Sequence, residues 1–312
     1  MLTGYATTKE ILLGNCMRLC SVRDFIHIIK LYKSRFQDPI SILLKNKRRN
    51  YPIKVKLCNR KVKAINNFGE LLSHLYDFEY DSENDILSLK KIGYPIKLYS
   101  GINNGETIGI FYKKDYEFLI DKSRDIVDIG ANIADSSIYF ALEGARRIIA
   151  IEPFLKNYEI ANHNILINNL SSKITLLHAA CASKDGEIFT DSSYEGVFKP
   201  HTGSAQNVKI DCLTLKHILS QYKLESPALK IDCEGCEYDL ILQSDPRIIQ
   251  EFSAIQIEYH YGCELLKRRL LDLGFRVRST KPRYRYNKFA TNKKMYVGWL
   301  FAENMKKSGA RK

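Results

Sequence analysis

Apolar positions along the chain separate a first region of about 105 residues from a longer region in which strands and helices alternate. In the first region the pattern predicts helices over 8–33 and 68–78, a hairpin of 53–57 with 61–65, and short strands at 86–89 and 96–99. We therefore expect residues 1–105 to be an N-terminal α+β extension that covers the following domain as a cap or carries substrate contacts.

Residues 106–312 have the pattern of an α/β domain with a doubly wound, mostly parallel sheet. The expected strands are 125–129, 146–151, 174–177, 228–232, 254–259, 275–279 and 295–302. Helical segments separate them, except that a loop joins the last two strands, which indicates an antiparallel edge. The polar stretch 186–210 is expected to form a hairpin or an active-site loop.

The stretch 125–137 predicts a buried strand, a tight turn and the start of a helix. Asp128 lies near the carboxyl end of this strand, two residues before Gly130, and a buried carboxylate needs a partner. Backbone amides of the turn or a cationic ligand could be that partner of the carboxylate. The turn lacks the G-x-G-x-x-G pattern of dinucleotide-binding folds, so a positively charged ligand such as S-adenosylmethionine fits better than a nicotinamide cofactor. The alternative is an ordinary strand-to-helix turn with a capped acid.

A second acid, Glu152, follows the next strand 22 residues after Gly130 and precedes Pro153. An acid about 20 residues beyond the turn is placed to accept both ribose hydroxyls of a nucleoside. Ala179 and Ala180 follow the third strand, where the adenine edge of such a ligand would lie. A solvated acid at a strand end is the alternative for Glu152.

Five segments with these features occur in order: Val127-Asp-Ile-Gly-Ala-Asn132, Ile151-Glu-Pro-Phe154, Asn164-x-x-x-Asn168-Asn-Leu170, Ala228-Leu-Lys-Ile-Asp-Cys-Glu-Gly-Cys-Glu237 and Ile257-Glu-Tyr-His260. Together they resemble the motifs of the FkbM-type family of class I S-adenosylmethionine-dependent methyltransferases, over about residues 105–302. One departure is Ala134, where the family usually has a second glycine.

The resemblance implies a seven-stranded Rossmann-like sheet and S-adenosylmethionine as the cofactor. It places the cofactor among Asp128, Gly130, Ala131, Asn132, Glu152, Pro153, Ala179, Ala180 and Asp232. FkbM-type relatives methylate hydroxyls of sugars, glycolipids and polyketide-like molecules, so the resemblance implies O-methylation of such an acceptor.

Acids and a histidine follow the ends of two neighbouring expected strands. Asp232 ends the fourth strand and Glu234 follows it, whereas Glu258 and His260 end the fifth. Ligands of open α/β sheets bind beyond the carboxyl ends of the strands, so we expect these side chains to converge. A hydroxyl is a very weak acid, so Asp232 or His260 is expected to act as the base, with Glu234 and Glu237 orienting the substrate or a neighbouring amide. The same set could hold a divalent ion, and a buried, hydrogen-bonded histidine is the alternative for His260.

The same motif contains three further residues of interest. Lys230 is expected to pair with one of the acids. Cys233 and Cys236 have C-x-x-C spacing, but no second pair follows, so we expect neither zinc nor redox chemistry there. The eight scattered cysteines fit a reduced intracellular compartment.

The formal charge of +13 suggests an acidic partner such as nucleic acid, an anionic membrane face or a phosphorylated substrate. Basic residues cluster at 45–49 and at 281–294, and in the second cluster Tyr284, Tyr286 and Phe289 lie between them. Such a mixture can stack on bases or sugars and hold phosphates. Solubilising surface charge and a flexible solvated hairpin are the alternatives.

Two rival functions follow from this charge: an RNA methyltransferase, or a basic module that keeps the fold but only docks on nucleic acid or membrane. Residues 232–235 lack the Asp/Asn-Pro-Pro-Tyr/Phe arrangement common in enzymes that methylate amino groups of bases. The sequence has no run of about 18 apolar residues that would span a bilayer. Its N-terminus lacks the order of a signal peptide, so we expect a cytoplasmic protein.

Overall fold

A computed structural model describes residues 22–48, 50–76, 78–89, 95–101, 106–191, 207–286 and 294–307. The described residues form two compact units, one up to Asp115 and one from Tyr116 onward. The division therefore lies ten residues beyond the expected boundary at 105, because helix α5 (Glu106–Lys113) belongs to the first unit. No helix among the described residues is both long and apolar enough to cross a membrane.

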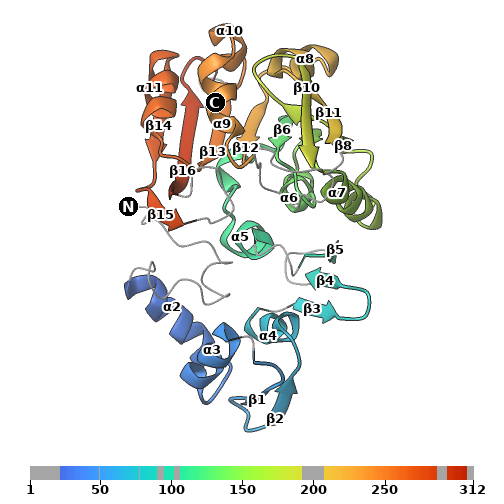
Figure 1. The fold of residues 1–312 in the computed structure, drawn as a ribbon, viewed down its shortest axis with the longest axis vertical. Coiled ribbons are helices and arrows are strands. Elements are labelled where there is room, and N and C mark those ends of the chain that lie inside the picture. The colour runs from blue at the N-terminus through green and yellow to red at the C-terminus, as the bar shows by residue number, and fades with distance from the viewer. Residues whose placement is uncertain are drawn as a thin grey trace. The chain divides into compact units, whose positions relative to one another are not determined.

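The first unit combines helices with two small antiparallel sheets (Figure 1). Before α5 its elements are α2 (Val22–Lys33), α3 (Pro39–Lys47), β1 (Ile53–Lys56), β2 (Val62–Ile65), α4 (Phe68–Leu75), β3 (Phe78–Asp81), β4 (Ile86–Leu89) and β5 (Ile96–Tyr99). The predicted hairpin is confirmed as β1 paired with β2, and β3, β4 and β5 form the second sheet. The part of the predicted 8–33 helix that precedes Val22 lies outside the described residues.

The second unit is built on a mostly parallel sheet with the order β14-β16-β13-β12-β6-β7-β8, and β15 also pairs with β16 (Figure 1). Its strands are β6 (Ile126–Ile129), β7 (Ile148–Ile151), β8 (Ile174–Leu177), β12 (Ala228–Ile231), β13 (Ala254–Tyr259), β14 (Phe275–Ser279), β15 (Arg283–Tyr286) and β16 (Lys294–Asn304). The predicted fold class, an α/β domain with a doubly wound, mostly parallel sheet, is confirmed, with β15 as an additional strand.

Helices connect these strands and cover the sheet. They are α6 (Asp135–Leu142), α7 (Leu155–Ile167), α8 (Leu215–Gln221), α9 (Cys236–Gln243), α10 (Pro246–Ile249) and α11 (Glu264–Asp272), preceded by a short 3-10 helix, η1 (Glu117–Leu119). Side chains of α8, α9 and α11 pack in one apolar core against alternate residues of β6, β7, β12 and β13. Helix α6, which contacts β6, β7 and β8, is not part of that core and covers the other face.

The predicted antiparallel edge is confirmed, because the last two expected strands, β14 and β16, pair antiparallel at one side of the sheet. β16 lies between β13 and β14 and is antiparallel to both. The burial of the two strands explains this order, since β16 is largely buried whereas β14 is mostly exposed beyond Phe275. The more exposed strand therefore takes the edge.

A separate small sheet holds β9 (Ala180–Cys181), β10 (Gly186–Asp191) and β11 (Asn207–Leu213) in the order β10-β11-β9. β10 and β11 are antiparallel, so the hairpin predicted within 186–210 is confirmed. The residues 192–206 that join the two strands lie outside the described part of the chain.

Candidate active site

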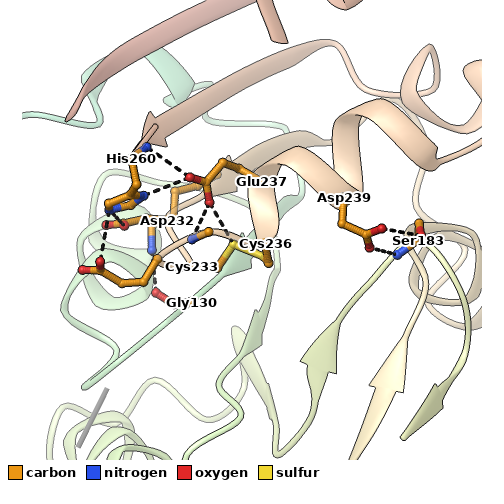
Figure 2. Close-up of a disulfide and its surroundings, with 11 residues drawn as sticks. Gly130, Ser183, Asp232, Cys233, Cys236, Glu237, Asp239 and His260 are labelled. Carbon is orange, nitrogen blue, oxygen red and sulfur yellow. Dashed lines mark hydrogen bonds and ion pairs between the residues drawn. A yellow bond between two sulfur atoms is a disulfide. The ribbon is translucent and has the colours of Figure 1, made fainter. Parts of the chain in front are cut away.

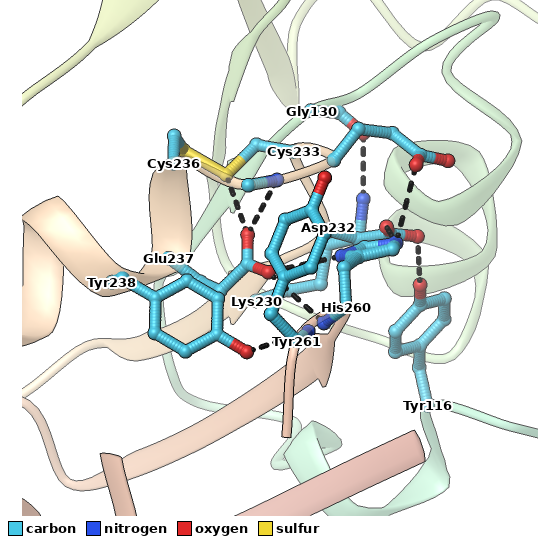
Figure 3. Close-up of polar contacts among 12 residues, drawn as sticks. Tyr116, Gly130, Lys230, Asp232, Cys233, Cys236, Glu237, Tyr238, His260 and Tyr261 are labelled. Atoms are coloured by element: carbon cyan, nitrogen blue, oxygen red, sulfur yellow. Dashed lines mark hydrogen bonds and ion pairs between the residues drawn. A yellow bond between two sulfur atoms is a disulfide. The ribbon is translucent and has the colours of Figure 1, made fainter. Parts of the chain in front are cut away.

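The carboxyl ends of β12 and β13 bring together the four residues expected to converge there. The two strands are parallel neighbours, with Ile231 opposite Ile257, so the residues that follow them meet at one edge of the sheet. The Nε2 atom of His260 lies 3.4 Å from Oε2 of Glu234 and 4.0 Å from Oδ1 of Asp232. Figure 3 shows this histidine beside Asp232 and Glu237. Glu258 belongs to the same group, since one ligand atom each of Asp232, Glu258 and His260 lies within 4.8 Å of the others.

Glu237 holds the imidazole of His260 in a defined orientation. The Oε1 atom of this fully buried carboxylate is 3.0 Å from Nδ1 of His260 and accepts its backbone N–H at 3.1 Å. Oε2 accepts the backbone N–H of Gly235 at 2.8 Å. A carboxylate accepts hydrogen bonds, so Nδ1 of the ring must donate, and Nε2 is left to face Asp232 and Glu234.

The charges around His260 set its protonation state. Burial lowers the pKa of His260, but the hydrogen bond and charge of Glu237, with the charges of Glu234 and Glu258, raise it to about 10. Burial raises the pKa of Asp232, and the positive charges of Lys230 and His260 only partly offset this effect. At neutral pH the imidazole of His260 is therefore protonated, with the acidic side chains around it.

Tyr116 is a site residue that the sequence analysis missed. Its hydroxyl donates to Oδ2 of Asp232 at 3.2 Å (Figure 3). Its ring makes edge contacts with Phe140 and Trp299. Tyr116 precedes the first predicted strand of the domain, 116 residues before Asp232, and belongs to none of the motifs. A sequence pattern could not have revealed this contact.

Asp128, expected to bind a cationic ligand or turn amides, has other partners in the structure. Its fully buried carboxylate pairs with Nζ of Lys230 at 2.9 Å and accepts from the hydroxyls of Ser136 and Ser137 at 2.7 and 2.6 Å. Lys230 also donates to the carbonyl of Gly130 at 2.7 Å. The expected pairing of Lys230 with an acid is confirmed, and these contacts join strands β6 and β12 at the turn.

The turn after β6 depends on residues in the left-handed region. Gly130 has φ of 76°, and a Cβ atom there would lie 1.9 Å from the carbonyl oxygen of Asp232. Close approach of the two strand ends therefore requires this glycine. Asn132 and Ala134 also have positive φ, 50° and 65°. The left-handed backbone at Ala134 gives a physical reason for the glycine that relatives usually have there.

Glu152 fixes the end of the neighbouring strand β7. Its buried carboxylate accepts the backbone N–H groups of Asn132 at 2.8 Å and Phe154 at 3.0 Å. Burial raises the pKa of Glu152 to about 7, even though these hydrogen bonds act in the opposite direction. The side chain of Asn157 lies 3.4 Å away as a third donor. A carboxylate has about four acceptor positions, and donors among the described residues take three of them.

The remaining residues expected at the cofactor lie next to these acids. Ala131 is fully buried in the turn after β6, and Pro153 follows Glu152, with its carbonyl oxygen 3.0 Å from Nε2 of His178. Ala179 and Ala180 are buried where the chain passes from β8 to β9. Their roles in binding stay predictions.

Cys233 and Cys236 form a disulfide, contrary to the expectation that this pair has no redox chemistry (Figure 2). The bond closes the loop between β12 and α9, immediately after Asp232 and before Glu237. The expectation relied on the absence of a second cysteine pair, which excludes a four-cysteine zinc site but says nothing about a bond within the pair itself. Among the other described cysteines, Cys58 is exposed and free, and three more are free and buried: Cys181, Cys212 and Cys263.

Residues 128–277 match the sequence model of the family described as Methyltransferase FkbM domain. This match confirms the predicted resemblance to the family over these residues. None of the curated proteins matches the chain.

Solved structures similar to this chain include methyltransferase FkbM from Methylobacillus flagellatus, with 18% identity, a TM-score of 0.41, and coverage of 63% of this chain and 47% of the other. The chain thus spans about half the length of that relative. A second is M. jannaschii TYW2 in complex with AdoMet, with 16% identity, a TM-score of 0.40, and coverage of 73% and 90%. A third is M. capricolum TrmK in complex with S-adenosyl-homocysteine, with 15% identity, a TM-score of 0.39, and coverage of 62% and 68%.

Proposed function

We propose that the protein transfers a methyl group from S-adenosylmethionine to a hydroxyl of a sugar, a glycolipid or a related small molecule, because residues 128–277 match the model of the methyltransferase FkbM domain. The observation that carries the proposal is the set of Asp232, His260 and Glu237 at the carboxyl ends of two neighbouring strands. The bound cofactor would supply an activated methyl group, so the protein has to position the acceptor and remove one proton.

The residues beyond β6, β7 and β12 suit a cationic nucleoside. The fourth acceptor position of Glu152 would take a ribose hydroxyl, beside the backbone of Ala131 and Asn132. Asp232, Glu234 and the other carboxylates around His260 outnumber the cations there, so a positively charged sulfonium or ammonium group would be favoured. Ala179 and Ala180 would flank the adenine.

Asp232 is the better candidate for the proton acceptor. His260 is 1% exposed and is already protonated at neutral pH, because its pKa is about 10. The side chain of Asp232 is 11% exposed, and its raised pKa brings it closer to the working pH of a general base. Tyr116 and the imidazolium of His260 then hold the carboxylate in place, and Glu237 positions His260.

The same side chains offer an alternative in which a divalent ion assists. Asp232, Glu258 and His260 each present one ligand atom, and these atoms lie within 4.8 Å of one another. Such an ion would lower the pKa of the acceptor hydroxyl and orient it. An ion would bind His260 only in its neutral form. A molecule that holds the ion therefore cannot also contain the imidazolium of His260.

An RNA acceptor is the second candidate, favoured by the exposed aromatic and basic residues around β15. Tyr284 is exposed and makes an edge contact with Tyr296, which is also exposed, and Lys281 and Lys294 are exposed beside them. The described part of the chain does not include residues 287–293 of this cluster. In the other basic cluster it leaves out Arg49 and the side chain of Lys47. Exposed rings with neighbouring cations can stack on bases and hold phosphates.

The test is methyl transfer by the full-length protein to a panel of glycans, glycolipids, small hydroxylated molecules and RNA. We expect Asp232→Asn to lower kcat/KM about 10³-fold, within the range for loss of a general base, while the affinity for S-adenosylhomocysteine measured by calorimetry falls far less. Asp245→Asn, at an exposed helix start, is the matched control and should keep wild-type activity.

The outcomes separate the candidates. Methylation of RNA alone would favour the second candidate, and activity lost with a chelator and restored by Mg²⁺ or Mn²⁺ would assign the divalent ion. Wild-type turnover by Asp232→Asn, or absence of S-adenosylhomocysteine binding by the wild-type protein, would contradict the proposal.

A further inference from the structure

We propose that the Cys233–Cys236 disulfide is a redox switch for methyl transfer, with the oxidised form active and the reduced form impaired. The inference rests on the proposed function, because it concerns the loop that carries Glu234 to the same site. It does not depend on which acceptor is methylated.

The disulfide closes a ring of four residues inside the site (Figure 2). The ring begins directly after Asp232 and ends directly before Glu237. Its two inner residues, Glu234 and Gly235, have φ of 55° and 131°, both in the left-handed region. Glu234 is not a glycine, so this conformation is unfavourable unless the surroundings hold it. The disulfide supplies that constraint and keeps the carboxylate of Glu234 3.4 Å from His260.

A second route connects the sulfur atoms to His260. Sγ of Cys233 lies 3.6 Å from Oε2 of Glu237, the carboxylate that orients the imidazole. In the disulfide this sulfur carries no hydrogen. After reduction the thiol of Cys233 could donate to Glu237, in competition with the N–H of Gly235, and a thiolate would repel the carboxylate. The redox state therefore changes the partners of the group that holds His260.

The position of the pair allows reversible reduction. Both cysteines are partly exposed, and Cys236 is the first residue of α9, where the positive end of the helix dipole stabilises a thiolate. The reductant would be a dithiol. One of its thiolates attacks a sulfur of the pair, forms a mixed disulfide and releases the other cysteine as a thiolate. Its second thiol then displaces the remaining cysteine, so two electrons and two protons reach the pair and the dithiol leaves oxidised.

The experiment compares the oxidised protein with protein reduced by dithiothreitol, using the full-length chain. Alkylation and mass spectrometry report the state of Cys233 and Cys236, and methyl transfer and the NMR resonances of His260 report the effect. We expect reduction to lower kcat/KM at least tenfold and to shift the His260 resonances, and oxidised glutathione should reverse both changes. Cys233→Ser with Cys236→Ser should resemble the reduced protein and lose the response. Cys58→Ser, at the exposed free cysteine, should keep the full response.

Two results would overturn the proposal. One is a pair that stays reduced in the presence of oxidised glutathione, and the other is reduction that changes neither kcat/KM nor the His260 resonances. If no acceptor is methylated in either state, the proposed function fails and the switch for methyl transfer fails with it. A shift of the His260 resonances on reduction would then still show that the cysteine pair is coupled to His260, and unchanged resonances would reject that coupling as well.

Discussion

Two neighbouring strand-to-helix turns of the second unit, after β6 and after β12, use the same residue types in different ways. Each combines an aspartate with a glycine: Asp128 lies near the end of β6 and Gly130 follows the strand, whereas Asp232 and Gly235 both follow β12. Asp128 is fully buried, and Lys230 and two serine hydroxyls surround its carboxylate. Asp232 is partly exposed and shares one histidine with several other acids.

The difference separates a structural acid from a reactive one. A buried carboxylate matched by a cation and hydroxyl donors has little left to offer a ligand, so Asp128 serves mainly to join β6 to β12. Around His260 the carboxylates exceed the positive charges, and a raised pKa keeps Asp232 able to accept a proton. Two similar motifs in one sheet therefore have different tasks, and charge balance distinguishes them.

The largest expected effect is on stability, at the first turn. Lys230→Met leaves Asp128 buried without its counter-ion, which should lower the free energy of unfolding by about 3–5 kcal/mol in urea titrations. Asp128→Asn combined with Lys230→Met should recover part of the loss. The control is Arg247→Met, at an exposed ion pair, which should change the free energy of unfolding far less. If Lys230→Met lowers the free energy of unfolding no more than this control does, the buried carboxylate of Asp128 does not depend on Lys230 as its counter-ion. The contrast drawn between the two turns would then be wrong.

The next effect is on activity, at the second turn. Glu237→Gln keeps the shape of the side chain but removes the charge that orients His260, so kcat/KM should fall about 10²-fold. Because Glu237 acts through His260, the pKa of His260 measured by NMR should fall in the same variant. Glu225→Gln, an exposed site outside the turn, should change neither quantity. If the Glu237→Gln variant kept wild-type kcat/KM and an unchanged pKa of His260, Glu237 would not be a positioning residue.

The smallest expected effect is on the pH dependence of stability. The carboxylates around His260 raise its pKa from about 6.5 to about 10 in the folded protein, so its protonation stabilises the fold fully below pH 6.5. This stabilisation is lost as the pH rises through about 10, with a slope of at most about 1.4 kcal/mol per pH unit. Urea unfolding between pH 7.5 and about 10 should show this slope in the wild type and lose it in His260→Asn. Equal slopes in both proteins would mean that His260 is neutral.

The titration of Glu152 does not interfere with this measurement. Burial raises its folded pKa to about 7, so its contribution to stability is lost as the pH rises through about 7. Most of that change is complete before the chosen range begins.

The sequence alone allowed the α/β class, most strands of the sheet and the convergence of Asp232, Glu234, Glu258 and His260 to be predicted. These predictions succeed because they depend on local periodicity and on one topological rule. Apolar runs such as Ile148–Ile151 are buried strands, and the carboxyl ends of parallel strands meet at one edge.

Only the tertiary structure decided which acids are neutralised and which stay available. Register places Lys230 opposite Asp128, the packing of Tyr116 against Trp299 brings its hydroxyl to Asp232, and the loop geometry joins Cys233 to Cys236. The same holds for β16, whose burial places it between β13 and β14. Each of these contacts depends on distances of a few ångströms between side chains brought together by packing. Sequence periodicity assigns a residue to an element and a face, whereas the partner of a charged group depends on which side chains the folded chain brings within hydrogen-bonding distance.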